Sequence, residues 1–577
     1  MTLPRHLMRY SAQELMYPPR CCSILTVLCS LLVQLPATAA EFSFRTQEIF
    51  NQLSVGYAVR LVDVNEDSRP DIVVVDTGRV VWFENPSWRM HTLIEHATKA
   101  DNVSIAEADI DGDGHLDFAL AADWRPSDTH ASGSLQWLSR GKSLDEPWSV
   151  HPIGAEPTAH RIRFADLDGD GRPELIVVPL FGRDTKAPDY ASAAVRMLSY
   201  RIPADPRGAW TPEIINADLH VAHNFLPVDF DSRGKLDLLV ASFEGVSLLR
   251  RDESGKWSRR LIGSGNQQTK PSRGASEIKL GKLADKGRYL ATIEPWHGFQ
   301  VVVYRPPVSP TNSEPSLWER TVLDENLKWG HAVWCADLDG DGDEELIIGV
   351  RDNKDAANPS GVRIYDPAGP QPAAWKAQRI DPGGVAVEDL TAGDLDGDGK
   401  LDVVAVGRQT KNVRIYWNQT PAASEQQQAL NPDFPTDTLL DIAGQKRSLA
   451  DLRGRVATAL VCWSIECPIS NEYIPTLNRL AERYGPQGIQ LIAIDSNGGE
   501  TLEAMRAHAQ KQRLALPFLQ DDAGKLARRL RFEVTPEVRV FDAGGALVYR
   551  GRIDDRYRSG SGGKPSVADL EQVFDAL

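Results

Sequence analysis

The sequence predicts a multidomain protein in which an all-β propeller of seven blades is followed by an α/β domain. Three observations support this prediction. An Asp- and Gly-rich loop recurs along residues 41–417, a short apolar run follows each copy, and after residue 433 strand-like segments alternate with helix-like ones. With 577 residues the chain exceeds the size of a single hydrophobic core, so two or more domains are expected.

Residues 1–40 have the pattern of a secretory signal peptide. Basic residues precede an apolar stretch from Cys21 to Leu35, and the following Ala37-Thr38-Ala39 is typical of a cleavage site. The apolar stretch is shorter than the roughly 20 residues that a membrane-spanning helix needs. We therefore expect a periplasmic or secreted mature chain that begins near Glu41 and has no membrane span after cleavage.

The acidic residues indicate bound cations. The formal net charge is -16, and no run rich in Lys or Arg occurs, so nucleic acid is not an expected partner. Much of the acidity lies in short clusters such as Asp166-Leu-Asp168-Gly-Asp170. Carboxylates at such spacing are the ligands that calcium prefers.

The repeated loop has the form D-x-D-G-D-G-x-x-D/E and occurs intact four times, beginning at Asp109, Asp166, Asp337 and Asp394. Two further copies are degenerate, one beginning at Asp63 and one with Asp229, Asp231 and Asp237 but Arg233 in place of a ligand. Around Lys282 the apolar residues of the repeat remain, but the carboxylates of the loop are absent. Successive copies are 46 to 63 residues apart, a spacing typical of a four-stranded propeller blade, so seven blades are expected.

Each loop joins two strands, because the following runs, such as Leu116 to Ala122 and Leu346 to Val350, are apolar and too short for helices. Alternate acids around a Gly turn can all point at one Ca²⁺ ion, which takes six to eight oxygen ligands. The expected calcium ligands are Asp63, Asn65, Asp67, Asp71, Asp109, Asp111, Asp113, Asp117, Asp166, Asp168, Asp170, Glu174, Asp337, Asp339, Asp341, Glu345, Asp394, Asp396, Asp398 and Asp402.

Two other interpretations of the loops fit less well. An EF-hand needs Glu at the twelfth loop position, whereas Leu120, Val177, Ile348 and Ala405 stand there. Hairpin turns without metal do not need three or four acids at fixed offsets. The loops and the strands that follow them resemble the FG-GAP or VCBS repeats of integrin-type β-propellers. This resemblance implies structural calcium on one face of the propeller and, often, adhesion or ligand binding.

A second candidate site lies at the opposite end of the innermost strands. Three blades carry a histidine six residues before the first loop position, namely His160, His223 and His331, and the other blades have Tyr57, Val103, Ser276 and Glu388 there. At roughly 3.3 Å per residue, this position lies about 20 Å from the loops. Symmetric strands would bring these side chains towards one axis. Histidines that merely pack in the strands are the alternative.

The loops that return to the same face add Glu294, Trp296 and His297, and Glu388 belongs to the same candidate site. Aromatic rings beside carboxylates suit a sugar, and clustered imidazoles suit Zn²⁺ or another divalent metal. The runs Arg273–Glu277, Glu294–Gly298 and Gly330–Cys335 resemble the propeller domain of aldos-2-ulose dehydratases. This resemblance implies metal-assisted elimination of water from a keto-sugar, with histidine or glutamate as the base.

Residues 418–432 are polar and have the composition of a linker, and residues 433–577 form a second domain. A strand-like run Ala457 to Trp463 leads to Cys467 at a helix start, and strands follow at Ile489 to Ile494, Val538 to Phe541 and Leu547 to Tyr549. This order resembles the thioredoxin-like redoxins of the thiol-specific-antioxidant group. The resemblance implies that Cys467 is the nucleophile, Trp463 a supporting aromatic residue, and Pro536 a cis-proline facing the sulfur.

Cysteine use in this domain departs from the usual dithiol pattern. After signal cleavage only Cys335, Cys462 and Cys467 remain, too few for a disulfide framework. Ser470 replaces the second cysteine of a C-x-x-C motif, so Cys467 is expected to form mixed disulfides or sulfenic acid unless another thiol resolves it. A helix N-terminus stabilises a thiolate, whereas the neighbouring Glu466 opposes it.

Three functions remain open. The leading hypothesis is an exported calcium-binding propeller protein whose thioredoxin-like domain acts as a thiol oxidoreductase or antioxidant through Cys467 and partners with protein thiols. The first alternative is a metal-dependent keto-sugar lyase or dehydratase in the propeller, with an accessory thioredoxin-like domain and a carbohydrate ligand. The second is an adhesion or binding protein without catalysis.

Overall fold

The computed structural model describes residues 41–577 except 285–286, 308–316, 352–358, 368–374, 423–432, 498, 522–523, 558–564 and 566. The expected signal peptide and most of the expected linker lie outside the described residues. Among those described, no helix has both the length and the apolar character needed to cross a membrane.

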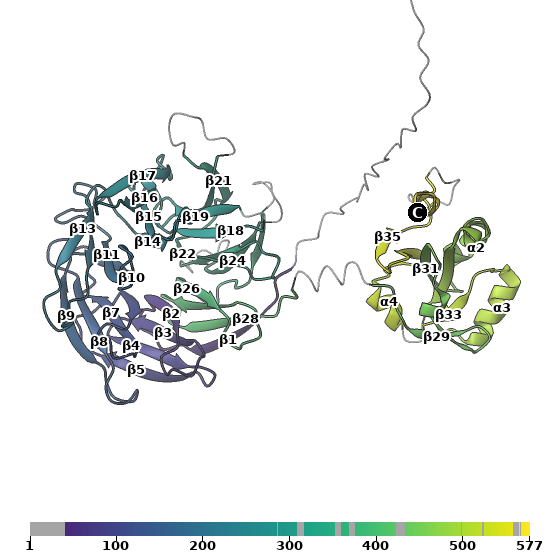
Figure 1. Cartoon of the computed structure of the whole chain (residues 1–577), viewed down its shortest axis with the longest axis horizontal. Coiled ribbons are helices and arrows are strands. Elements are labelled where there is room, and N and C mark those ends of the chain that lie inside the picture. The colour runs from purple at the N-terminus through teal and green to yellow at the C-terminus, as the bar shows by residue number, and fades with distance from the viewer. Residues whose placement is uncertain are drawn as a thin grey trace, which may run out of the picture. The chain divides into compact units, whose positions relative to one another are not determined.

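Seven four-stranded antiparallel sheets form the propeller, as the loop spacing predicts (Figure 1). The innermost strands are β2 (Ala58–Val62), β6 (Ser104–Ala108), β10 (Ala159–Ala165), β14 (Asn224–Val228), β18 (Lys279–Lys282), β22 (Gly330–Ala336) and β26 (Val387–Gly393). The second strands are β3 (Asp71–Asp76), β7 (Asp117–Ala122), β11 (Glu174–Pro179), β15 (Asp237–Ser242), β19 (Arg288–Glu294), β23 (Glu345–Val350) and β27 (Asp402–Gly407).

The third strands are β4 (Arg79–Glu84), β8 (Ser134–Ser139), β12 (Met197–Tyr200), β16 (Gly245–Arg251), β20 (Gln300–Arg305), β24 (Gly361–Asp366) and β28 (Val413–Asn418). The outer strands are β5 (Arg89–Glu95), β9 (Ser149–Ala155), β13 (Pro212–Asn216), β17 (Trp257–Gly263), β21 (Glu319–Asp324), β25 (Lys376–Arg379) and β1 (Phe44–Phe50).

Burial explains why the run after each Asp-rich loop is so apolar. The second strand of a blade, for example β7 or β23, is buried along its whole length because adjacent blades cover both of its faces. Outer strands such as β9 are mostly exposed or half-buried, and in β9 only Ile153 is buried. The Asp-rich loops join each innermost strand to the second strand, as expected from the sequence.

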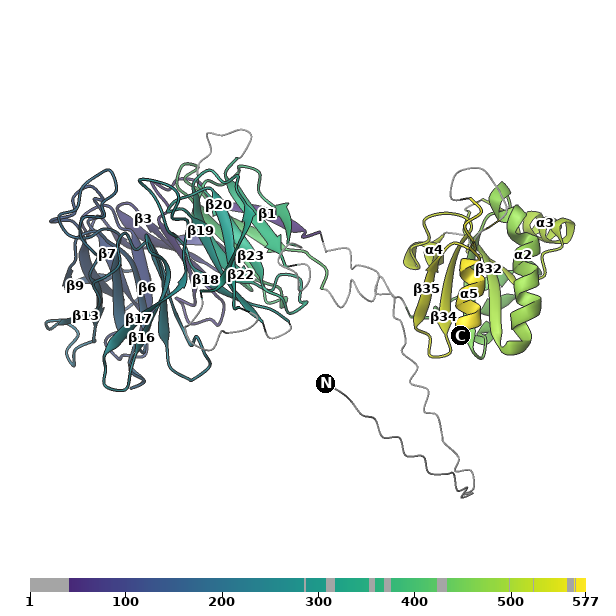
Figure 2. The ribbon, with the colours of Figure 1, turned by 90° about the horizontal axis from the view of Figure 1, so that it is seen from above.

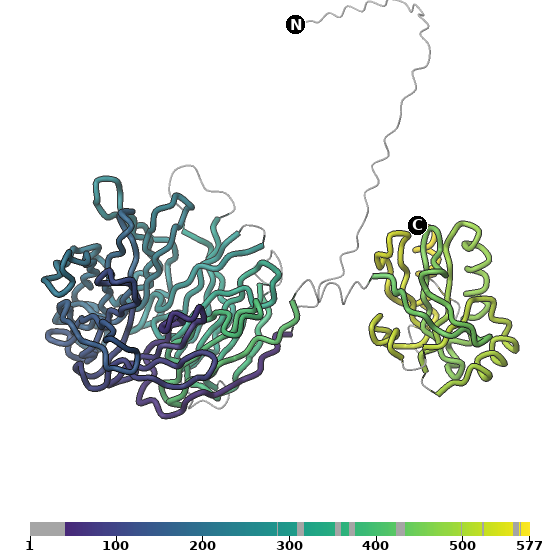
Figure 3. Tube along the Cα trace, turned by 60° about the horizontal axis from the view of Figure 1, so that its bottom comes forward, coloured from purple at the N-terminus to yellow at the C-terminus, as the bar shows by residue number. Residues whose placement is uncertain are grey.

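The last blade is closed by the start of the described chain. β1 pairs antiparallel with β28, with Phe44 opposite Asn418, and so supplies the outer strand beside β26, β27 and β28. In Figure 3 this purple strand runs along the green end of the propeller. This closure joins the two ends of the repeat array in one sheet, so the last blade has four strands like the others.

The C-terminal domain is a mixed sheet of seven strands, ordered β30-β29-β33-β32-β31-β34-β35, with helices beside it (Figure 2). Its strands are β29 (Thr438–Asp441), β30 (Lys446–Ser448), β31 (Ala457–Trp463), β32 (Ile489–Asp495), β33 (Phe518–Gln520), β34 (Glu537–Asp542) and β35 (Leu547–Gly551). Its helices are α2 (Pro468–Tyr484), α3 (Leu502–Gln512), α4 (Lys525–Arg529) and α5 (Asp569–Ala576), with short 3-10 turns at Ala450–Leu452 and Gly485–Gln487.

Alternation along the strands divides the core of this domain in two. On β31, Val461 packs in the cluster that includes Leu477 of α2 and Phe574 of α5. The adjacent Leu460 packs in the other cluster, with Leu526 of α4. Successive residues of a strand point to opposite faces, so each face of the sheet receives its own helices. This thioredoxin-like arrangement confirms the predicted fold and places Cys467 at the start of α2, shortly after β31 ends at Trp463.

Candidate functional site

Four imidazole rings lie together where the innermost strands begin. The ring centroids of His160 and His223 are 4.7 Å apart, and those of His223 and His331 are 5.2 Å apart. His297, in the loop between β19 and β20, lies 4.6 Å from the ring of His223 and 4.8 Å from that of His331. Residues from separate blades therefore meet at one end of the channel, opposite the Asp-rich loops.

Three of these histidines have the geometry of metal ligands. One ring nitrogen each from His223, His297 and His331 lies within 4.8 Å of the others, and the Nε2 atoms of His223 and His297 are 2.8 Å apart. The sequence predicted His160, His223 and His331 as the converging set. In the structure His297 takes the third place in the possible metal group, and His160 lies beside it.

Backbone contacts fix the orientation of the strand histidines. The Nδ1 atoms of His160, His223 and His331 lie 3.2, 3.2 and 2.6 Å from the carbonyl oxygens of His223, Ser276 and Glu388, respectively. Each acceptor occupies the equivalent position in the next blade. When Nδ1 donates to a carbonyl, Nε2 carries a free lone pair, which is the form that binds a metal or accepts a proton.

A buried carboxylate supports one of the ligands. Oε1 of Glu277 lies 2.8 Å from Nδ1 of His223, and the side chain of Asn224 donates to Oε2 of the same carboxylate. Glu277 is only 3% exposed. A carboxylate behind a histidine is a common second layer of a metal site, since it orients the ring and raises its basicity. Glu277 was not among the predicted site residues, although it directly follows Ser276, which occupies the position six residues before the loop in its blade.

Burial keeps these imidazoles neutral. It lowers the pKa of His223, and it lowers the pKa values of His160, His297 and His331 well below the ordinary range. The charge of Arg161 further lowers the pKa of His160. Neutral imidazole is the form that coordinates a divalent ion.

Aromatic side chains surround the histidines. The Trp296 ring stacks on His297 at 4.2 Å with an interplanar angle of 18°, and Trp124 lies 4.8 Å from His160. Trp329 lies 5.6 Å from His297 and is 47% exposed. An exposed ring beside polar groups is a suitable platform for the apolar face of a sugar.

The two predicted glutamates have different surroundings. Glu388 lies in the site, with Oε1 3.9 Å from Nε2 of His331, and it accepts hydrogen bonds from Arg408 at 2.8 Å and Arg351 at 3.4 Å. Glu294 does not join the site. It is fully buried and pairs with Tyr304, Thr292 and Arg320. These three partners lie on β19, β20 and β21 of the same blade, so Glu294 is engaged within its own sheet.

The Asp-rich loops bring some, but not all, of the expected ligands together. Carboxylate oxygens from the first, third and ninth loop positions lie within 4.8 Å of one another in four loops, in the groups Asp109, Asp111 and Asp117; Asp166, Asp168 and Glu174; Asp337, Asp339 and Glu345; and Asp394, Asp396 and Asp402. The fifth-position carboxylates instead accept the backbone N–H two residues later, as Asp113 does from His115 at 2.8 Å. Asp170, Asp341 and Asp398 make the same contact.

The backbone conformation of these loops explains their Gly residues. The close approach of buried carboxylates in the same loops is electrostatically unfavourable. Asp109 accepts the N–H groups of Gly112 at 2.8 Å and Gly114 at 3.1 Å, and both glycines have left-handed φ values of 75° and 87°. Burial, with the nearby Asp111, raises the pKa of Asp117 to about 7. A cation bound here would relieve this cost.

The degenerate loop of the fourth blade contains its own cation. Arg233 pairs with Asp231 at 2.5 Å and with Asp237 at 3.2 Å. Arg250 of β16 reaches the same two carboxylates, at 2.9 and 2.6 Å. Guanidinium groups therefore pair with the acidic cluster of this loop, and in the intact loop of the third blade Arg201 likewise contacts Asp168 and Glu174. In the first blade, Asp67 and Asn65 remain in contact through their side chains.

The C-terminal domain places its predicted residues around one thiol. Cys467 is the N-cap of α2, and its Sγ lies 3.3 Å from the carbonyl oxygen of Thr535, whose bond to Pro536 is cis. Burial raises the pKa of Cys467, but hydrogen bonds from the Ser470 and Ile469 backbone and from the Thr535 and Ser470 side chains lower it overall.

The other thiols lie in less reactive surroundings. Burial raises the pKa of Cys462 to about 11 and that of Cys335 to about 12. Trp463 is fully buried within the core of the C-terminal domain, at the end of β31. Ser470 is also fully buried, so its hydroxyl lies where a resolving thiol would otherwise stand.

Comparisons with known proteins agree with this two-part organisation. Residues 132–306 match the β-propeller domain of aldos-2-ulose dehydratase, residues 63–120 and 337–405 match FG-GAP-like repeats, and residues 430–550 match the AhpC/TSA family. The chain is 26% identical over 329 residues to the aldos-2-ulose dehydratase of Phanerodontia chrysosporium, covering 54% of this chain but only 35% of that enzyme.

The C-terminal domain has its own relatives. It is 23% identical over 126 residues to the thiol-disulfide oxidoreductase ResA of Bacillus cereus, covering 22% of this chain and 71% of that protein. A hypothetical protein of known structure from Sinorhizobium meliloti 1021 is 29% identical, with a TM-score of 0.24, and covers 26% of this chain and 83% of that one.

Proposed function

We propose that the propeller is a metal-dependent lyase that eliminates water from a keto-sugar. The observation that carries the proposal is the meeting of His223, His297 and His331 from three separate segments, with their nitrogens within 4.8 Å and the Nδ1 atoms of the strand histidines engaged by carbonyls. The similarity to a dehydratase whose name specifies an aldos-2-ulose supports the substrate class.

The three histidines fit a divalent ion such as Zn²⁺, since neutral imidazole nitrogens with a carboxylate behind one of them are its usual ligands. A bound ion of this kind would polarise the carbonyl oxygen of the substrate as a Lewis acid. Trp329 stacks against the sugar, and Arg351, whose Cζ lies 4.5 Å from the Trp329 ring, supplies donors to its hydroxyls.

His160 is the proposed base. It is only 5% exposed, and its Nδ1 lies 3.2 Å from the His223 carbonyl, so Nε2 can accept a proton. Nε2 of His160 takes the proton from the carbon next to the carbonyl, and a C=C bond forms between this carbon and the following one. The C–O bond to the hydroxyl on that following carbon breaks, and the hydroxyl takes the proton held by His160 and leaves as water. Glu388, paired with Arg351 and Arg408, positions the groups around His331 rather than accepting this proton.

The test is an elimination assay with the full chain loaded with Zn²⁺ and a 2-keto-aldose as substrate, with the unsaturated product followed by its ultraviolet absorbance. His160→Gln should lower kcat by about 100-fold or more while metal content is retained, since a general base contributes roughly 10²–10⁴-fold. Glu388→Gln should change KM more than kcat. Full activity in His160→Gln, or no elimination by the metal-loaded wild type, would refute the proposal.

We also propose that the four intact loops bind structural Ca²⁺. Three carboxylates within 4.8 Å in each loop support this, because their mutual repulsion is relieved by a cation. The chain would then carry structural calcium at one end of the blades and a catalytic metal at the other.

A second activity is supported by Cys467. Its lowered pKa and its place at a helix N-terminus favour a thiolate that attacks a partner disulfide. In that step an S–S bond breaks, Cys467 forms a mixed disulfide, and the second sulfur leaves as a thiolate. The test is glutathionylation of the full chain, which Cys467→Ser should abolish.

A further inference from the structure

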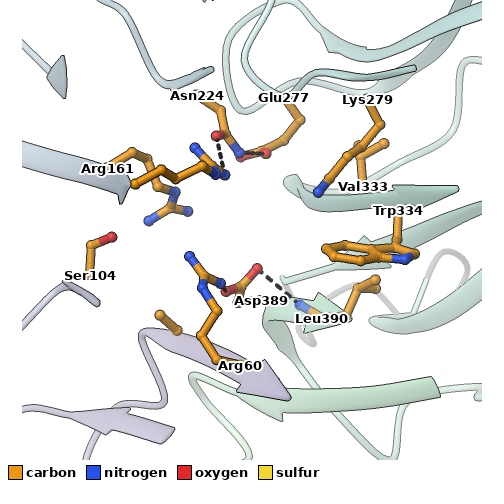
Figure 4. Close-up of a pocket in the computed structure, with 12 residues that line it drawn as sticks. Arg60, Ser104, Arg161, Asn224, Glu277, Lys279, Val333, Trp334, Asp389 and Leu390 are labelled. Atoms are coloured by element: carbon orange, nitrogen blue, oxygen red, sulfur yellow. Dashed lines mark hydrogen bonds and ion pairs between the residues drawn. The ribbon is translucent and has the colours of Figure 1, made fainter. Parts of the chain in front are cut away.

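A cationic pocket lies in the central channel, one to three residues further along the innermost strands than the histidines. It is lined by Ala58, Arg60, Ser104, Arg161, Arg163, Asn224, Glu277, Lys279, Val333, Trp334, Asp389 and Leu390. Figure 4 shows the nitrogen-bearing ends of Arg60, Arg161 and Lys279 directed into the same space. Four of the seven innermost segments contribute a charged side chain to this lining.

The charges in this pocket do not balance internally. Four cationic side chains face two carboxylates, Glu277 and Asp389. Glu277 is already engaged by His223 and by Asn224. Asp389 accepts the N–H groups of Val59 and Leu390, both at 3.1 Å. Even when both carboxylates are charged, the guanidinium groups of Arg60, Arg161 and Arg163 leave the pocket with excess positive charge.

Arg161 is the clearest sign that a partner is missing. It is only 5% exposed, and within the described part of the chain its guanidinium forms no hydrogen bond or ion pair. It acts on the Glu277 carboxylate only through space. An ionised group buried without a partner costs several kcal/mol, so such a group normally faces a ligand or a counter-ion.

Two neighbouring cations also have unused donors directed at the pocket. Arg163 donates to Asn224 at 2.9 Å through Nη2, but its buried Nη1 has no partner. Nζ of Lys279 lies 3.6 Å from the centroid of the Trp334 ring and pairs with no described carboxylate. Arg60 pairs loosely with Asp389 at 3.6 Å and with Glu107 at 3.9 Å. Donors therefore converge from three sides of the channel.

We propose that this pocket binds a small oxyanion, held by Arg161 and Arg163 with Arg60 and Lys279 around it. The shared chemistry is a compact group with several acceptor oxygens, either inorganic phosphate or sulfate, or the carboxylate of a sugar acid. Guanidinium groups suit such a ligand because their N–H donors pair with two oxygens at once. This inference stands on the channel charges alone and does not depend on the proposed lyase activity.

The oxyanion should also change the protonation of Lys279. Burial, with the charges of Arg163 and Arg60, lowers the pKa of Lys279 to about 7, against smaller opposing effects of Asp389 and Cys335. At pH 8 the amine is therefore mostly neutral. An anion in the pocket favours the ammonium form and raises this pKa, so binding at pH 8 should take up as much as one proton.

The experiment is calorimetric titration of the full chain with inorganic phosphate, sulfate, D-gluconate and chloride at pH 8. Repeating the phosphate titration in buffers of different ionisation enthalpy reports proton uptake. Arg161→Gln should weaken phosphate binding about tenfold or more, because a charge-assisted contact is lost. The matched control is Arg259→Gln, since Arg259 is an exposed residue of β17 outside the channel.

A stability measurement separates ligand loss from misfolding. Without added anions, Arg161→Gln should melt at the same or a higher temperature than the wild type, because it removes an unpaired buried charge. Lys279→Met should abolish the proton uptake. Tighter binding of gluconate than of phosphate identifies an organic acid as the ligand, and the reverse order identifies a free inorganic anion. The absence of saturable oxyanion binding, equal binding of chloride, or unchanged binding in Arg161→Gln would overturn the proposal.

Discussion

The Nε2 atoms of His223 and His297 lie 2.8 Å apart although the two residues are 74 positions apart in the sequence. Two ring nitrogens at this distance either share one proton or face a common cation. Since His223 has its Nδ1 next to the Ser276 carbonyl and the Glu277 carboxylate, its Nε2 is available as an acceptor. If both nitrogens bind the same metal ion, the lone pair of each Nε2 atom is used.

His297→Ala should therefore remove tight Zn²⁺ binding from the propeller. Replacing a residue that lies behind a metal ligand typically lowers metal affinity by about 10–100-fold. Because His297 is itself a proposed ligand, we expect its loss to lower zinc affinity by more than about 100-fold. Competition with a chromophoric chelator measures this affinity. His130→Ala is the matched control, because His130 is an exposed residue that pairs with Asp184 away from the cluster. Equal zinc affinity in wild type and His297→Ala would exclude the predicted site.

Glu277 should act as a positioning residue for His223. Glu277→Gln keeps the shape of the side chain but removes the charge that faces Nδ1 at 2.8 Å. We expect zinc affinity to fall by roughly 10–100-fold, as for other carboxylates behind a histidine ligand. Glu294→Gln provides the comparison, because Glu294 is equally buried but pairs with Tyr304 and Arg320. A similar loss in both variants would indicate a general structural effect instead.

The fold could be predicted from the sequence because its signals are local and repeated. Loop spacing indicates seven blades, and the apolar runs coincide with the buried second strands. Closure by β1 could not be predicted this way, since Phe44–Phe50 resembles any other outer strand and pairs with residues about 370 positions later. Local pattern carries no information about such distant pairing.

The candidate site was only partly predictable for the same reason. The offset of six residues identified His160, His223 and His331 because these positions repeat along equivalent strands. The role of His297 depends on a turn in which its φ is 50°, and Glu294 is engaged by partners within its own sheet. Arg161 could not be predicted from the sequence. It matters because no described side chain pairs with its guanidinium group, and this is visible only when the strands are arranged around the channel.

The intact loops and the fourth-blade loop should respond differently to calcium. In calcium-containing buffer, Asp394→Asn should melt at a lower temperature than the wild type. We expect the free energy of unfolding to fall by about 1–3 kcal/mol, because calcium stabilises the variant less. After chelation, the difference between variant and wild type should shrink. Asp229→Asn should behave alike with and without calcium, since Arg233 and Arg250 already neutralise the Asp231 carboxylate of that loop. Thermal unfolding monitored by circular dichroism measures both. A chelator-insensitive wild type would contradict the calcium assignment.

Cys467 should be the first thiol of the described chain to react as pH rises. Its pKa is lowered overall, whereas burial raises the pKa values of Cys462 and Cys335 to about 11 and about 12. The thiolate is the reactive form, so alkylation of Cys467 should level off at a lower pH than that of an ordinary thiol. Peptide mapping after treatment with iodoacetamide at pH 7 should find Cys467 modified and the other two largely free.

The fate of a mixed disulfide tests whether Ser470 sets the chemistry of this domain. A glutathione adduct on Cys467 should persist until an external thiol is added, because the fully buried Ser470 hydroxyl cannot attack it. Ser470→Cys should release the glutathione without an external thiol, since the new sulfur would stand one helical turn from Cys467. Mass spectrometry of the intact chain follows the adduct over time. If the wild-type adduct resolves as fast as that of Ser470→Cys, another thiol in the chain must act as the resolving group, and Cys462 is then the one to substitute next.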